Sequence, residues 1–158
     1  MKIYIIGISM EGCKTLKEKT KSVIENVDLL IGAGRMLEPF SDLKKEQFTS
    51  WKSEEIADFL REKNFDTAAI LMSGDCGFYS GAEKLIAALS DYETEVISGI
   101  SSPVYFCSKI KKPWQDMKFL SLHGADGNIV RNVCRNKYCF FLLGGDTTPA
   151  EICKRLCD

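Results

Sequence analysis

Short apolar runs alternate with amphipathic segments along almost the whole chain. The runs are rich in β-branched residues and lack a clean two-residue alternation, which predicts buried strands over residues 2–9, 28–32, 67–72, 94–97, 118–122 and 137–143. Between them, apolar and small residues recur at helical spacing, which predicts helices over 16–27, 35–38, 53–63, 81–89 and 127–135, one that follows Pro103 and one after residue 146. This alternation predicts an α/β fold with a largely parallel sheet.

Two local signals refine this picture. Ser53 is followed by Glu54 and Glu55, which predicts that Ser53 caps a helix whose first turn is acidic. Lys111-Lys112-Pro113 interrupts the pattern, which predicts a hinge between two lobes, an N-terminal α/β lobe over 1–111 and a C-terminal α/β lobe over 112–158.

Three loops follow predicted strands and precede helices, at 7–12, 73–79 and 99–102. All three contain glycine, which lets a ligand approach the backbone. Ligands of open α/β sheets bind outside the carboxyl ends of the strands. We therefore expect these loops to form a ligand site.

Charge and composition exclude several classes of protein. The formal net charge is −1 with both signs interspersed, which disfavours a nucleic-acid partner. No apolar run is long enough to cross a membrane and the N-terminus does not resemble a signal peptide, so we expect a cytoplasmic protein. The seven cysteines form no CxxC pair and there is one histidine, so no metal site is predicted.

The loop sequences resemble those of the tetrapyrrole methylases over essentially the whole chain. The segment Ser73-Gly74-Asp75-Cys76-Gly77-Phe78-Tyr79 is similar to the family's Ser-Gly-Asp-Pro-x-Phe-Tyr, with cysteine in place of proline. The segment 98–102, Ser-Gly-Ile-Ser-Ser, is similar to the family's Pro-Gly-Ile-Ser-Ser. The segment 7–12 keeps Gly7 and a nearby Gly12 of the loop Gly-x-Gly-Pro-Gly-x, but Ser-Met-Glu replaces Gly-Pro-Gly. Residues 113–116 and 120–124 are similar to the branch that methylates C5 of a cobalt-precorrin.

The resemblance implies a two-lobed fold with the methyl donor, S-adenosylmethionine, in a cleft between the lobes. It implies methylation of a ring carbon, C5, of a cobalt-precorrin in cobalamin biosynthesis. It also implies a homodimer, a possible separate protein for C15 methylation and decarboxylation, and a C-terminal lobe that is incomplete here. The residues assigned to the methyl donor are Gly7, Ser73, Gly74, Asp75, Phe78, Ser101, Ser102 and Leu143.

Three further residues are candidates for the substrate and the chemistry. Arg35 suits a carboxylate of the tetrapyrrole, Tyr79 is a second substrate candidate, and His123 is the candidate for accepting a proton from the methylated intermediate. Each candidate has a purely structural alternative. For Arg35 the more common alternative is a solvated helix start, and for His123 it is support of a loop. Phe78 and Tyr79 are compatible with packing in the core.

The same ambiguity applies to the donor loops, because Asp75 suits a turn and Ser101 and Ser102 suit a helix cap. Two other functions stay open. A dinucleotide-binding oxidoreductase domain is disfavoured because residues 7–12 lack the second glycine of that motif and contain Glu11, which would repel phosphate. A non-catalytic binding or partner domain of the same fold is compatible with the altered first loop.

Overall fold

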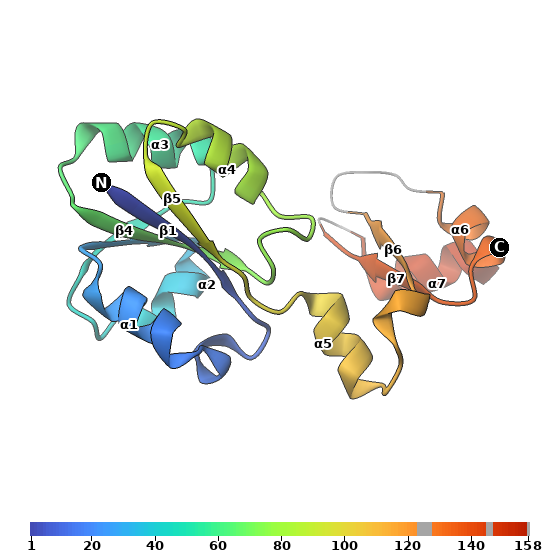
Figure 1. The fold of residues 1–158 in the computed structure, drawn as a ribbon. Coiled ribbons are helices and arrows are strands. Elements are labelled where there is room, and N and C mark those ends of the chain that lie inside the picture. Colours follow the sequence, from blue (N-terminus) through green and yellow to red (C-terminus); the bar gives the residue numbers. More distant parts are fainter. Residues whose placement is uncertain (123–127, 145–146, 158) are drawn as a thin grey trace. The chain divides into compact units, whose positions relative to one another are not determined.

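The computed structural model describes residues 1–122, 128–144 and 147–157 (Figure 1). The chain divides into two compact units, Met1–Ser102 and Pro103–Asp158. The lobe division predicted between residues 111 and 112 falls inside the second unit and stays a prediction. None of the described helices combines the length and the apolar character needed to span a bilayer.

The first unit is built on a five-stranded parallel sheet. Its strands are β1 (Lys2–Ile8), β2 (Leu29–Gly32), β3 (Glu46–Thr49), β4 (Thr67–Ser73) and β5 (Glu93–Ile97), in the order β3-β2-β4-β1-β5. Each neighbouring pair is parallel. The predicted α/β fold and largely parallel sheet are therefore confirmed.

Helices cover both faces of this sheet (Figure 1). On one face, α3 (Ser53–Glu62) and α4 (Ala82–Ala88) pack over Ile3 and Ile5 of β1. On the other, α1 (Glu18–Asn26) and α2 (Gly34–Leu37) pack with Ile6 and Ile8. Because both faces are buried, the central strands are apolar at successive positions, which explains the uninterrupted runs in the sequence.

Strand β3 is the element that the sequence pattern did not predict. Its residues, Glu-Gln-Phe-Thr, are largely polar, and it pairs with β2 alone at the edge of the sheet. One side chain anchors it, because the ring of Phe48 stacks on Phe59 of α3 with centroids 3.9 Å apart. An edge strand with a single packed residue gives too little periodicity to be recognised.

The cap predicted at Ser53 is also wrong. Lys52 is the N-cap of α3 and Ser53 is its first residue. The helix start has no side-chain capping bond, and the buried Ser50 acts one step earlier, because its Oγ accepts a hydrogen bond from the amide of the N-cap residue Lys52 at 3.2 Å. The same hydroxyl donates to Oε2 of Glu55 at 2.8 Å.

The second unit contains most of α5 (Ser102–Lys109), followed by β6 (Lys118–Ser121), α6 (Ile129–Arg135), β7 (Cys139–Leu142) and α7 (Pro149–Cys157). A short 3-10 turn precedes β6 at Trp114–Asp116, and the first unit has two such turns, at Gly12–Thr15 and Glu38–Phe40. Strands β6 and β7 pair in parallel. Leu122, Ile129 and Ile152 form the buried centre of this unit.

The core of the first unit predicts a clear contrast between two isoleucines. Ile5 is fully buried, whereas Ile86 on α4 is 38% exposed. We expect Ile5→Ala to lower the free energy of unfolding by about 2–5 kcal/mol, because it leaves a cavity. Ile86→Ala should change it by less than about 0.5 kcal/mol. Urea unfolding of both variants checks this, and equal losses would contradict the assigned core.

Acid should weaken the link between β2 and β4 at their amino ends. The carboxylate of Asp28 accepts hydrogen bonds from the hydroxyl and the amide of Thr67, both at 2.9 Å, and these bonds hold the pKa of Asp28 below its ordinary value of 3.8. A carboxyl that is more acidic when folded contributes its full stability above its unfolded pKa and loses it as the pH falls through the folded pKa.

We therefore expect the stability advantage of the natural protein over Asp28→Asn to be complete at neutral pH and to shrink below about pH 4. Unfolding free energies of the two proteins, measured from neutral pH to about pH 3, test this. A difference that stays constant over that range would show that the Asp28 charge plays no part.

Candidate functional site

Three loops meet at the carboxyl edge of the sheet in the first unit, after β1, β4 and β5. The amide of Gly74 donates to the carbonyl oxygen of Ile8 at 2.6 Å, which joins the β4 loop to the end of β1. The amide of Ile100 donates to Oγ of Ser9 at 2.8 Å, which joins the β5 loop to the β1 loop. The loops predicted at 7–12, 73–79 and 99–102 are therefore brought together.

The backbones of these loops are packed so closely that two positions have no room for a side chain. A Cβ atom built on Gly7 would lie 2.5 Å from the amide nitrogen of Gly99 and would collide with the carbonyl oxygen of Gly74. A Cβ atom on Gly99 would lie 2.5 Å from the carbonyl oxygen of Gly7 and would meet the same Gly74 oxygen. Gly74 itself has φ of +72°, which favours glycine.

The β4 loop is a tight turn organised by Asp75. Its Oδ1 accepts from the Gly77 amide at 2.8 Å, and its carbonyl oxygen accepts from the Phe78 amide at 3.1 Å. The Phe78 ring meets Tyr79 edge-on, with centroids 4.8 Å apart. Asp75 thus has the structural role that the sequence left open, and its side chain is still partly exposed.

Cys76 stands where the family pattern has proline, and it points inward. Its side chain is buried, and Sγ lies 4.0 Å from the carbonyl oxygen of Ile5. Burial, together with the negative charge of Asp75, raises the pKa of the Cys76 thiol. A buried thiol that resists ionisation is a packing residue and not a nucleophile.

The other predicted residues are distributed over both units. Ser101 is buried next to Gly74, because a Cβ atom on that glycine would lie 3.8 Å from Cα of Ser101, and Ser102 begins α5. Ser73, at the end of β4, is exposed. Leu143 belongs to the second unit, where it packs against the buried centre formed by Leu122, Ile129 and Ile152. His123 lies outside the described residues.

Arg35 and Tyr79, the predicted substrate residues, are both exposed in segments that follow strands at the same edge of the sheet. Arg35 lies on α2 directly after β2, and Tyr79 follows β4 with 58% of its surface exposed.

Two residues with structural roles at this edge, Ser9 and Gly99, were not singled out from the sequence. The paired loop glycines were the available signal for Gly99, whereas nothing in the sequence indicated the Ser9 bond.

A hollow of about 570 Å³ opens beside the first and third loops, between β5 and the start of α1. Gly7, Ser9, Gly99 and Ile100 line it where it adjoins the loops. Lys17, Lys19 and Glu95 bring both signs of charge to its wall. Its volume is that of a small-molecule site, although Gly7 is the one predicted donor residue in its lining.

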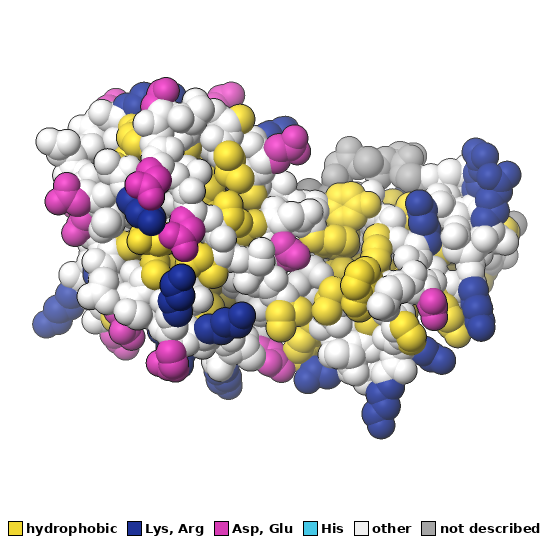
Figure 2. All heavy atoms as spheres, in the orientation of Figure 1, with side chains coloured by type: hydrophobic (Ala, Val, Ile, Leu, Met, Phe, Trp, Pro, Cys, Tyr) yellow, Lys and Arg dark blue, Asp and Glu magenta, His cyan; other side chains and the backbone are white. Residues whose placement is uncertain are grey.

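Charge on the first unit is mixed, as Figure 2 shows for the visible face, where acidic and basic side chains alternate. Among the residues that the structure describes, no three His, Cys, Asp or Glu side chains gather so that they could hold a metal ion. The arrangement offers a hollow of small-molecule size beside closely packed backbone at the strand ends of a parallel sheet.

These features define an α/β protein with a parallel sheet whose glycine-rich loops meet at the strand ends. Residues 2–158 match the family of Tetrapyrrole (Corrin/Porphyrin) Methylases, and the chain belongs to this family. The family predicted from the three loops is therefore confirmed.

Individual relatives agree with this assignment. The chain is 33% identical over 132 residues to a probable cobalt-precorrin-7 C(5)-methyltransferase of Methanocaldococcus jannaschii, a match that covers 80% of this chain and 62% of the relative. It is 26% identical over 123 residues to the cobalt-precorrin-7 C(5)-methyltransferase of Salmonella typhimurium, covering 77% and 61%. The chain thus spans less than two thirds of these curated relatives.

The fold is also that of a solved relative. The precorrin-6Y methylase from Archaeoglobus fulgidus superposes with a TM-score of 0.70 at 20% identity, covering 96% of this chain and 77% of that one. At this identity the likeness concerns the fold alone.

The close packing of the loops predicts opposite outcomes at two glycines. Gly99→Ala should lower the free energy of unfolding by about 1–3 kcal/mol or more, because the new methyl group meets backbone atoms that cannot move aside. Gly81 is the control, since its φ is −72° and its Cβ would lie 3.8 Å from Cε of Met72. Gly81→Ala should be tolerated in the same urea-unfolding measurement. Equal stability of the two variants would refute the close approach of the loops.

Proposed function

We propose that this chain is part of an S-adenosylmethionine-dependent methyltransferase that methylates C5 of a cobalt-precorrin in cobalamin biosynthesis. The main support is the junction of the β1, β4 and β5 loops at Gly7, Gly74 and Gly99, in a chain that belongs to the tetrapyrrole methylases. The substrate and the methylated carbon follow the names of the two curated relatives.

The described residues of the first unit fit a sulfonium donor. The glycines bring backbone close to the site, and the partly exposed Asp75 carboxylate provides a negative charge for the positive sulfur. Ser101 is buried beside Gly74, where its hydroxyl or amide would add a polar contact. Gly7, Ser73, Phe78, Ser102 and Leu143 are proposed as the remaining donor contacts.

When bound, S-adenosylmethionine supplies a methyl group already activated by a positive sulfur, so the reaction requires alignment more than a protein nucleophile. The fixed loop junction provides that alignment, and orientation can contribute roughly 7–11 kcal/mol. Arg35 and Tyr79 are proposed to hold the substrate, and His123 to accept the proton that the ring carbon loses.

The match to the tetrapyrrole methylases argues against the alternative of a dinucleotide-binding oxidoreductase domain. A homodimer, a separate C15-methylating and decarboxylating protein, and a cytoplasmic location stay predictions. A non-catalytic domain of the same fold is an outcome that the binding and turnover experiments below distinguish from an enzyme.

Calorimetric titration with S-adenosylhomocysteine, with NAD as a control, tests the proposed donor. We expect micromolar binding of the first ligand alone, and we expect methyl transfer from S-adenosylmethionine to a cobalt-precorrin. Binding without turnover would favour the non-catalytic domain, whereas absence of donor binding would refute the proposed function.

The role of the Asp75 charge can be separated from its role in the turn. Asp75→Asn keeps an oxygen for the Gly77 amide and removes the negative charge. We expect it to weaken the binding of S-adenosylmethionine about two- to fivefold, the size of a partly exposed ion pair, and to leave unchanged the binding of S-adenosylhomocysteine, whose sulfur is neutral. Equal effects on both ligands would show that Asp75 acts through the turn alone.

A further inference from the structure

Four of the six large exposed hydrophobic residues of the first unit follow strands at the same edge of the sheet as the ligand loops, whereas Ile86 lies on α4 and Val96 within β5. Met10 follows β1, Trp51 follows β3, Tyr79 follows β4 and Ile100 follows β5. Trp51 is the most exposed of them, with 75% of its surface open to solvent. A large exposed indole is uncommon on a protein surface and marks a site of interaction.

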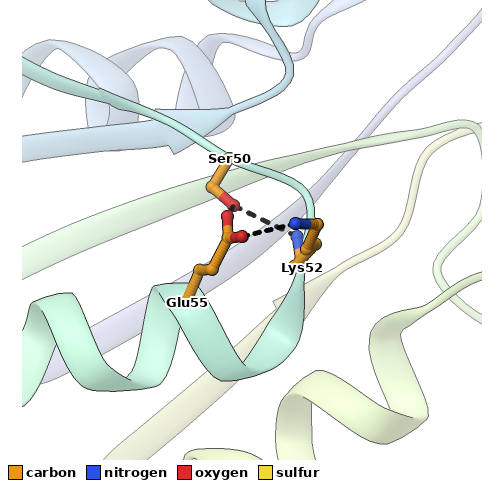
Figure 3. Close-up of polar contacts among 3 residues, drawn as sticks. All are labelled: Ser50, Lys52 and Glu55. Carbon is orange, nitrogen blue, oxygen red and sulfur yellow. Dashed lines mark hydrogen bonds and ion pairs between the residues drawn. The ribbon is translucent and has the colours of Figure 1, made fainter.

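The segment that bears Trp51 is fixed on both sides of the indole (Figure 3). The buried Ser50 donates its amide to the carbonyl oxygen of Gly32 at 3.1 Å, which ties the segment to β2. Its Oγ bridges the Lys52 amide and the Glu55 carboxylate. Nζ of Lys52 lies 2.6 Å from Oε1 of Glu55, so each of the three residues contacts the other two. These contacts order the backbone on either side of Trp51, which lowers the entropy that the segment loses when it binds a ligand.

The positively charged guanidinium of Arg35 belongs to α2, which follows the neighbouring strand β2. Thr49 pairs with Gly32 in the β2–β3 register, and a Cβ atom on Gly34 would lie 4.0 Å from Cγ2 of Thr49, so the two loops leave the sheet side by side. Arg35 is the next residue along the chain, in the first turn of α2, and it is exposed. Within residues 1–122, 128–144 and 147–157 its guanidinium takes part in none of the ion pairs.

We propose that Trp51 and Arg35 form an anchor for the tetrapyrrole substrate, a proposal that rests on the proposed function. The flat conjugated ring system stacks on the indole, and a carboxylate of the macrocycle pairs with the guanidinium. Strand β2 separates β3 from β4, so this anchor lies about 10 Å across the sheet edge from the donor loop. The macrocycle thus extends from Trp51 toward the loop after β4, which carries Asp75 and Tyr79.

Calorimetric titration with hydrogenobyrinic acid, a metal-free corrin with free carboxylates and no axial ligands on either face, tests the anchor, and S-adenosylhomocysteine is titrated into the same proteins. We expect Trp51→Ala to raise the Kd for the corrin about tenfold and Trp51→Phe to retain most of the affinity, because the smaller ring still stacks. Both variants should bind S-adenosylhomocysteine as the natural chain does. Ile86→Ala, an exposed apolar residue on α4, is the matched control and should leave both ligands unchanged.

Lys17→Ala distinguishes the competing location, the hollow between β5 and α1. If Lys17→Ala weakens the corrin and Trp51→Ala does not, the substrate lies in that hollow and the proposal is overturned. It is also overturned if the natural chain binds S-adenosylhomocysteine but no corrin, an outcome that leaves the donor site intact. Loss of both ligands in the natural chain would instead refute the proposed function itself.

Discussion

The backbones of β1, β4 and β5 approach one another at Gly7, Gly74 and Gly99 so closely that a side chain on Gly7 or Gly99 would strike peptide atoms. The rest of the site depends on this approach. It brings the Gly74 amide to Ile8 and the Ile100 amide to Ser9, and it places Ser101 beside Gly74. The approach is possible because the three strands are adjacent in the sheet and end at the same edge.

The sheet holds this junction in place through its two buried faces. Successive residues of β1 enter opposite clusters, Ile5 under α3 and α4 and Ile6 over α1 and α2. A shift of β1 by a single residue would exchange these faces and would put a side chain in place of Gly7, where backbone leaves no room for one, so packing and the loop junction determine the register together. Because register fixes where each strand ends, the apolar core also determines which residues of the loops meet.

The parts of the fold that depend on such burial were predictable from the sequence, and those that depend on one or two contacts were not. β1 and β4 have long apolar runs, and their prediction is confirmed. β3 is polar apart from Phe48, and the packing of Phe48 on Phe59 that stabilises it joins residues distant in sequence. At α3, the serine before two acids indicated a cap, but Ser50 lies where it can reach both the Lys52 amide and Glu55.

The same distinction applies to the candidate site. Motifs within one loop, such as residues 73–79, were recognisable because the turn at Asp75 is local. The mutual packing of Gly7 and Gly99, and the position of Trp51 beside the β2 loop, arise from strand order, which a motif does not encode. The exposed indole lies after a strand that the pattern missed. A residue can thus face the ligand edge of a sheet without belonging to any recognisable motif, so candidate ligand contacts have to be sought along every strand end.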